Sequence, residues 1–165
     1  EGQVTETAQL SLAVEPAVIS ETLFFFTFIF YSITGSVAWF MKEKLGLNLF
    51  YAIIIGKIVA VILTPLLFLA YHVFRYGTSQ AELLGVYLLG FTSAVTVAIT
   101  DSMIFAYMVH ASGNFFHKLA ELELFTSEAT ILITLGALVV SPLLYLCVID
   151  PYDIFREGWL GDLFQ

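Results

Sequence analysis

Four long apolar segments constrain the fold of this chain more than any other feature. They cover residues 22–41, 48–71, 83–109 and 129–149. Each is long enough, as a helix rising roughly 1.5 Å per residue, to cross a hydrocarbon layer of about 30 Å. Six basic and 14 acidic residues make 20 charged side chains, and only Lys57 and Asp101 lie inside these segments. A soluble bundle would carry polar stripes at helical spacing, which these segments lack, so the sequence predicts a membrane protein.

The predicted fold class is all-α: a polytopic membrane protein whose four transmembrane helices form two antiparallel hairpins. The turn after the first helix is short and contains Gly46 and Asn48, which favours the first hairpin. Residues 112–127 carry apolar side chains at helical spacing and are expected to form a short helix in the membrane interface. The predicted parts of the chain are a polar N-terminal tail (1–20), the transmembrane domain (21–149) and an interfacial C-terminal tail (150–165).

The distribution of charge indicates possible partners and an orientation. The net charge of −8 comes from the tails and loops and does not favour binding to nucleic acid or to anionic lipid surfaces. With the N-terminus outside, the basic residues of loops and tails divide three to two, inside against outside: Lys42, Lys44 and Lys118 against Arg75 and Arg156. This weak bias predicts that both termini lie outside, with the plasma membrane as the expected location. The first residue, Glu1, is consistent with a cleaved signal peptide and equally with other processing.

Lys57 and Asp101 are predicted to form an ion pair inside the membrane. A charged side chain at the middle of a bilayer costs about 2.5–3.5 kcal/mol on insertion scales, so both should face protein. In antiparallel second and third helices, both residues are displaced toward the same leaflet. A depth difference of about 3 Å is within the reach of a lysine side chain. Exchange of the two charges should then preserve part of the interaction.

Small residues at fourfold spacing flank this pair on both helices and predict close helix packing. They are Gly56 and Ala60 on the second helix, and Gly90, Ala94 and Ala98 on the third. Two prolines, Pro65 and Pro142, should bend the second and fourth helices, because each removes a backbone hydrogen bond.

The histidines are the candidates for a metal or haem site. His72 ends the predicted second helix and His110 ends the third, on opposite sides of the membrane, so the two are not expected to hold one haem. His110, His117 and Glu121 share one side and are a weak candidate metal site. The sequence Ser-Gly-Asn at 112–114 should interrupt the helix between the two histidines. No cofactor is predicted, and the bound molecules expected are lipids.

Three classes of function fit these features. The first is a non-catalytic integral-membrane subunit that assembles with itself or with other chains through its small-residue faces. The second is a small ion- or proton-coupled transporter or channel centred on Asp101 and Lys57, and the third is a membrane redox subunit that binds haem or a metal. The first is favoured, because no second buried ionisable residue is evident that could pass a proton onward. No known catalytic motif indicates an enzyme, and the single cysteine, Cys147, excludes an internal disulfide.

Overall fold

The computed structural model describes residues 16–76 and 80–121, together with five isolated positions at 126, 129, 132, 136 and 140. All regular structure in this part of the chain is helical. The elements are a π-helical segment η1 (Thr22–Ile29) and the helices α2 (Phe30–Leu45), α3 (Leu49–Tyr76), α4 (Gln80–Thr100) and α5 (Met103–Glu121). Three continuous helices are long and apolar enough to cross a membrane: Pro16–Leu45, Leu49–Phe74 and Glu82–Thr100. The prediction of an all-helical membrane protein is confirmed to this extent.

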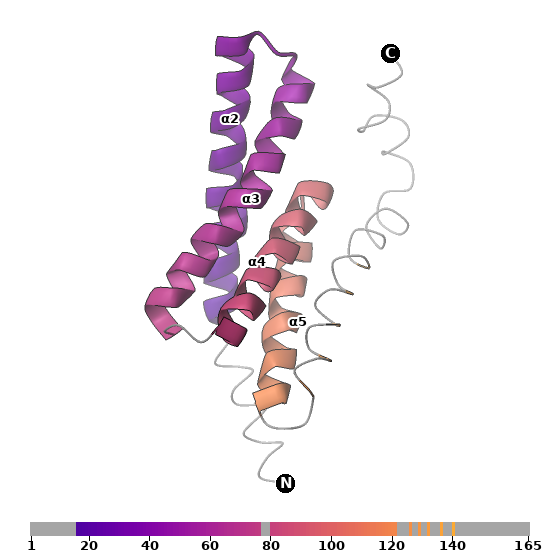
Figure 1. Ribbon diagram of the computed structural model, residues 1–165. Helices are drawn as coiled ribbons and strands as arrows, with labels where there is room; N and C mark the ends of the chain where they lie inside the picture. The colour runs from indigo at the N-terminus through magenta and orange to yellow at the C-terminus, as the bar shows by residue number, and fades with distance from the viewer. Residues whose placement is uncertain are drawn as a thin grey trace.

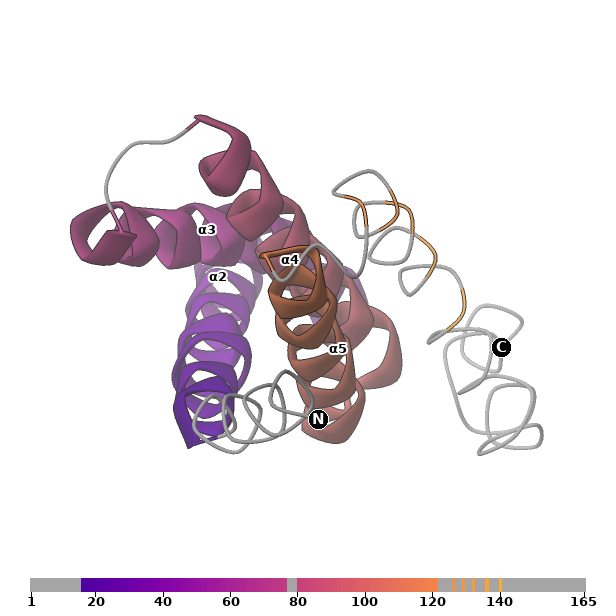
Figure 2. The same ribbon diagram turned by 90° about the horizontal axis from the view of Figure 1, so that it is seen from below.

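The helices form a closed bundle in which the first and last described elements meet. α2 and α3 are antiparallel, and α4 and α5 form a second, shorter antiparallel pair beside them (Figure 1). α4 lies between α3 and α5, and α5 packs against η1. The view from below shows that α2 and α5 lie on the same side of α3 (Figure 2). The segment η1 closes the ring, because it contacts α3, α4 and α5.

The turn between α2 and α3 is short for reasons that the sequence makes evident. Gly46 has a φ of 68°, a left-handed conformation that glycine adopts without steric cost. The N–H groups of Gly46 and Leu47 donate to the carbonyl groups of Lys42 and Met41, each at 3.1 Å, and so close the end of α2. The Asn48 side chain accepts a hydrogen bond from the N–H of Phe50 at 2.8 Å and caps the start of α3.

The third apolar segment, predicted as one helix over 83–109, is not one helix. α4 ends at Thr100 and α5 begins at Met103, and between them Asp101 has a φ of 48°. Aspartate tolerates this left-handed conformation better than most residues do. The Thr100 hydroxyl accepts a hydrogen bond from the N–H of Ser102 at 3.2 Å, which stabilises the reversal. The chain therefore turns back at Asp101, and α5 returns alongside α4.

A second correction concerns the predicted interruption at 112–114. α5 runs without a break from Met103 to Glu121, so a separate interfacial helix does not begin there. The reason is packing: Gly113 is buried, and its lack of a side chain leaves room for Leu89 of α4. Pro65 lies inside α3, and the helix continues through it. The predicted fourth helix (129–149) with Pro142 lies outside the described residues except at isolated positions, and residues 1–15, Cys147 and the C-terminal tail lie outside them altogether. Residues 16–20, predicted as part of the polar N-terminal tail, instead belong to the first helix, which begins at Pro16.

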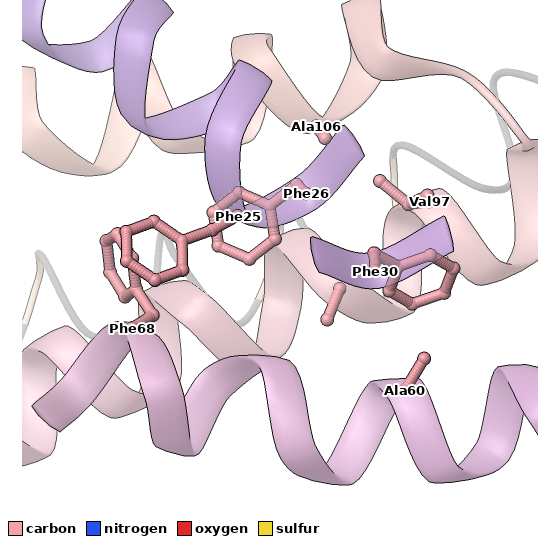
Figure 3. Close-up of a cluster of buried hydrophobic side chains, with 8 residues drawn as sticks. Phe25, Phe26, Phe30, Ala60, Phe68, Val97 and Ala106 are labelled. Carbon is pink, nitrogen blue, oxygen red and sulfur yellow. The ribbon is translucent and has the colours of Figure 1, made fainter. Parts of the chain in front are cut away.

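The core is formed by large aromatic residues of the first helix and small residues of the others. Phe25 and Phe26 pack against Phe68 of α3, and Phe30 lies further along the same cluster, which also includes Ala60, Ala94, Val97 and Ala106 (Figure 3). The Phe68 ring centroid lies 5.3 Å from that of Phe25 and 5.4 Å from that of Phe26. These are favourable edge or tilted contacts between aromatic rings.

The π-helical segment explains how the first helix keeps one face in this core. The residues Thr22, Phe26, Phe30, Thr34 and Ala38 are all buried, although they are spaced by four. In an α-helix of 3.6 residues per turn, each such step rotates the side chain by roughly 40°. A π turn is wider and rotates it in the opposite sense, so η1 offsets the rotation that accumulates in α2.

We expect Gly56→Ala to lower the thermal stability of the protein, because a Cβ at this position would lie 2.5 Å from the backbone oxygen of Thr34. Forcing two helices apart in this way costs roughly 1–3 kcal/mol. Thermal unfolding in a mild detergent would measure the effect. The matched control is Gly35→Ala, where an added Cβ meets nothing within 4 Å, and this variant should be as stable as the parent or more so. Equal melting temperatures for Gly56→Ala and the parent would contradict the observed α2–α3 packing.

Candidate functional site

The structure brings Lys57 and Asp101 together. The Lys57 ammonium donates hydrogen bonds to Asp101 Oδ2 at 2.6 Å and to the Ala98 carbonyl oxygen at 3.1 Å. The second bond is made to the last turn of α4, where the helix dipole is negative and a cation is favourable. The Tyr31 hydroxyl donates to the other carboxylate oxygen of Asp101 at 3.4 Å. Lys57 thus caps α4 as well as pairing with Asp101.

The sequence analysis expected Asp101 to lie within a helix, and this expectation is wrong. Asp101 occupies the turn after α4, and 52% of its side-chain surface is exposed, against 9% for Lys57. The α2–α3 pair extends past this turn (Figure 1). Lys57 lies eight residues after Leu49, the first residue of α3, so this extension is about 12 Å long. The pair therefore marks one end of the spanning helix α4.

The predicted small residues are used for packing inside the chain. A Cβ on Gly90 would lie 2.9 Å from Cδ1 of Phe68, and Ala60 and Ala94 are fully buried. Ala98 is partly buried against the core, and its carbonyl oxygen binds Lys57. Together with Gly56 these residues let α3 approach its two neighbours closely.

A second group of ionisable side chains, Glu21, His72 and His110, lies at the other end of the bundle. Their exposed fractions are only 7%, 7% and 1%. The carboxylate oxygen Oε2 of Glu21 lies 3.8 Å from Nε2 of His72 and 3.5 Å from Nε2 of His110. The three residues come from the start of the first helix, the end of α3 and the middle of α5. We refer to them below as the Glu–His–His cluster.

This cluster corrects the expectation that His72 and His110 lie on opposite sides of the membrane. That expectation assumed an unbroken third helix up to residue 109. Because the chain reverses at Asp101, α5 carries His110 back to the end of the bundle where α3 ends. Sequence reasoning did not identify Glu21, which directly precedes the first apolar segment. Two features of the sequence could have indicated this cluster. A glutamate directly precedes the first apolar segment, and a histidine directly follows the second.

Hydrogen bonds fix the orientation of both imidazole rings. Nδ1 of His72 lies 2.8 Å from the carbonyl oxygen of Phe68, and Nδ1 of His110 lies 3.1 Å from the Thr22 hydroxyl. The Phe68 ring packs against both histidines, with centroid distances of 4.2 Å to His72 and 5.3 Å to His110. Nε2 of His110 is within ion-pair distance of Glu21, yet it makes no hydrogen bond to any described residue.

Buried hydroxyl groups lie on the inner faces of the helices that connect the two ionisable groups. They are Thr34, Thr64, Thr92, Ser93, Thr96 and Thr100. Thr96 and Thr100 donate to backbone carbonyl oxygens one turn earlier in α4, as is common for threonine in helices. The hydroxyls of the other four find no hydrogen-bond partner within the described part of the chain. Along α3, Thr64 lies midway between Lys57 and His72, which are about 22 Å apart.

The residues of the candidate metal site are not brought to one point. His117 is exposed and lies about 10 Å from His110, two turns further along α5. The side chain of Glu121 is outside the described part. Among the residues that the structure describes, no three His, Cys, Asp or Glu side chains are arranged to hold a metal ion.

Comparisons with models of protein families, with curated proteins and with solved structures found no match to this chain. The arrangement of the side chains described above is therefore the basis for assigning a function.

We expect Lys57→Met to destabilise the protein by roughly 1–3 kcal/mol, because it removes the donor that the Asp101 carboxylate shares with the end of α4. Asp101→Asn should cost less, since asparagine also tolerates the left-handed conformation and can still accept from Lys57. The charge exchange Lys57→Asp with Asp101→Lys should not restore stability, contrary to the sequence-based expectation. An aspartate at 57 cannot donate to the Ala98 carbonyl. Thermal unfolding of the three variants would test this order, and full recovery in the exchanged variant would contradict the capping role of Lys57.

Proposed function

We propose that this protein moves protons across a membrane along the buried polar side chains of its helix bundle. The observation that carries the proposal is the Glu–His–His cluster. In the sequence analysis, a transporter or channel centred on Asp101 and Lys57 ranked second because no further buried ionisable group was evident. The cluster supplies three such groups at the opposite end of the bundle.

The residue types suit proton transfer. Histidine changes its charge near neutral pH, and a hydroxyl group can donate and accept a hydrogen bond at the same time. Ionisable side chains in apolar spanning segments are costly, and they commonly mark the routes of ions or protons. The half-exposed Asp101 would exchange protons with water at one end, and the cluster would do so near the other. Thr64 and the α4 hydroxyls lie between them.

Topology and location are part of this proposal. We retain a span at 129–149 and the plasma membrane as location. Since α5 returns to the side on which the first helix begins, that span would place the two termini on opposite sides, so the prediction that both lie outside is not retained. The orientation, however, has less support than the sequence indicated. Because α5 returns to the side on which the first helix begins, Lys118 now groups with Arg75 at the end of α3, while Lys42 and Lys44 lie at the other end. Two basic residues on each side leave no positive-inside bias among the described residues.

We expect the purified protein to carry protons when it is reconstituted into lipid vesicles that enclose a pH-sensitive dye. Glu21→Gln should reduce the flux by at least about tenfold, because a neutral amide removes an exchangeable proton from the route. Asp101→Asn should also reduce it. The matched control is Glu82→Gln, which changes an exposed carboxylate at the start of α4 and should leave the flux unchanged. Parent protein that carries no more protons than protein-free vesicles would contradict the proposal.

A second candidate is the assembling subunit that the sequence analysis favoured. Its support is a patch of small, exposed residues on α2, namely Ser32, Gly35 and Ser36. Nothing lies within 4 Å of a Cβ added at Gly35, so another helix could approach this face closely. The small residues that the sequence analysis singled out on α3 and α4, in contrast, already pack within the chain.

If this second candidate is correct, Gly35→Leu should reduce the oligomeric state, because its side chain would keep a neighbouring helix away from α2. Light scattering after size-exclusion chromatography in a mild detergent would measure the mass of the complex. Gly85→Leu on α4, also at an open position, is the control and should leave the mass unchanged. A monomeric parent in both detergent and nanodiscs would contradict assembly through this face.

A further inference from the structure

Aromatic residues mark where the α2–α3 pair meets one surface of the membrane. Trp39 and Tyr51 are both more than half exposed. A Cβ on Gly56 would touch the backbone of Thr34, so these two positions lie level with each other in the antiparallel pair. Trp39 lies five residues after Thr34. Tyr51 lies five residues before Gly56, so both aromatic side chains lie at one level. Tryptophan and tyrosine concentrate where hydrocarbon meets headgroups, and this level is therefore a membrane surface.

The spacing of tyrosines along α3 matches the thickness of a bilayer. Tyr71 is exposed near the other end of α3 and follows Tyr51 by 20 residues, or about 30 Å of helix. The hydrocarbon core of a bilayer is also about 30 Å thick. Lys42 and Lys44 lie beyond the first of these levels, and Arg75 lies beyond the second. The apolar layer of the membrane therefore extends from Tyr51 to Tyr71.

The turn at Asp101 lies inside this layer. Lys57 lies six residues, or about 9 Å, past Tyr51 toward the middle of the membrane, and it binds Asp101 at 2.6 Å. A second measure starts at Gly90, where an added Cβ would lie 3.5 Å from Cα of Pro65. Asp101 lies eleven residues after Gly90. The same number of residues back along α3 from Pro65 ends about 5 Å inside Tyr51. The turn therefore lies about 5–9 Å below the membrane surface, and α4 ends before it reaches that surface.

The side chains next to the turn agree with this depth. Ile99, Met103 and Ile104 are 44%, 38% and 66% exposed, which is unfavourable in water but not in lipid. The Asp101 side chain, in contrast, is a carboxylate with 52% of its surface exposed. A charge facing lipid at this depth is costly, and irregular backbone inside a membrane occurs only where it is buried in protein or lines water. The exposed part of Asp101 therefore needs a polar environment.

The adjoining surface of α2 suits water. Tyr31 binds Asp101, and Trp39 lies two turns further along α2 at the membrane surface. The exposed residues of α2 between these two are all small. They are Ser32, Gly35 and Ser36. Serine hydroxyls bind water, and no large apolar side chain of α2 is exposed along this stretch. The α2–α3 pair extends past the turn in the same direction (Figure 1).

We propose that Asp101 is a hydrated site inside the membrane, reached by water from the α2–α3 end of the bundle along the small exposed residues of α2. The ligand is water together with the protons that it carries. The inference deepens the proposed function, because Asp101 is one end of the proposed proton route. It rests on that function only for the role of the site, since hydration can be measured with no proton gradient.

The test is power-saturation EPR of single spin labels in lipid vesicles, in a Cys147→Ser background that removes the native thiol. Labels at Ser102→Cys and Gly35→Cys report on the turn and on the small-residue surface of α2. The matched control is Ile58→Cys, because Ile58 follows Lys57 directly and is 54% exposed. Dissolved oxygen concentrates in lipid, whereas a charged or neutral nickel chelate stays in water. We expect the nickel chelate to relax the labels at 102 and 35 at least about fivefold more than the label at 58, since only the first two contact water.

Three outcomes would overturn the inference. The first is labels at 102 and 35 that respond to oxygen alone, as a label in lipid does, and the second is a label at 102 shielded from both reagents, as protein cover would produce. The third is a label at 58 that responds to the nickel chelate as strongly as one at Lys44→Cys, which would place the turn outside the membrane. If Ser102→Cys does not fold, Gly35→Cys and Ile58→Cys still decide between these outcomes.

Failure of this inference is distinguishable from failure of the proposed function. Water at Asp101 in a protein that shows no proton flux in vesicles would contradict the proposed function alone. Proton flux in a protein whose labels at 102 and 35 do not meet the nickel chelate would contradict this inference alone.

Discussion

The bundle depends on the reversal of the chain at Asp101. A non-glycine residue in the left-handed conformation costs of order 1–3 kcal/mol, and it persists only where its surroundings hold it. Here Lys57 binds the Asp101 carboxylate and the last turn of α4 together, and Tyr31 binds the second carboxylate oxygen. Without the reversal α5 would extend away from the bundle. With it, α5 packs against η1, the ring of helices closes, and His110 reaches Glu21 and His72.

The packing of the bundle matches large side chains with small ones. The first helix supplies three phenylalanines to the core. At the points of closest approach, α3, α4 and α5 carry alanines and glycines. In a membrane, lipid is as apolar as the core, so close fit rather than burial from water holds helices together. The π turns of η1 serve this fit because they keep the fourfold-spaced residues of the first helix on one face.

Charged and polar groups are placed where their burial costs little free energy. Lys57 is paired with Asp101 at one end, and Glu21 faces two histidines at the other. Between them the buried polar residues are neutral hydroxyls, which cost far less than charges in apolar surroundings. A proton crossing this interior would meet ionisable groups at both ends, and the same arrangement leaves no isolated buried charge among the residues that the structure describes.

Several features followed from the sequence alone. The membrane class followed from the apolar segments, because a lipid environment leaves few alternatives to long apolar helices. The proximity of Lys57 and Asp101 followed from their matching depths, and the tight turn after α2 from Gly46 and Asn48. The break between α4 and α5 could not be predicted, since residues 95–110 contain neither glycine nor proline and favour a continuous helix. One bond that stabilises the break is local, between Thr100 and Ser102, but the bonds to the Asp101 carboxylate come from Lys57 and Tyr31, 44 and 70 residues earlier in the chain. Tertiary structure therefore decided where α5 lies, and with it which histidines meet Glu21, because a turn held by distant side chains leaves no local pattern.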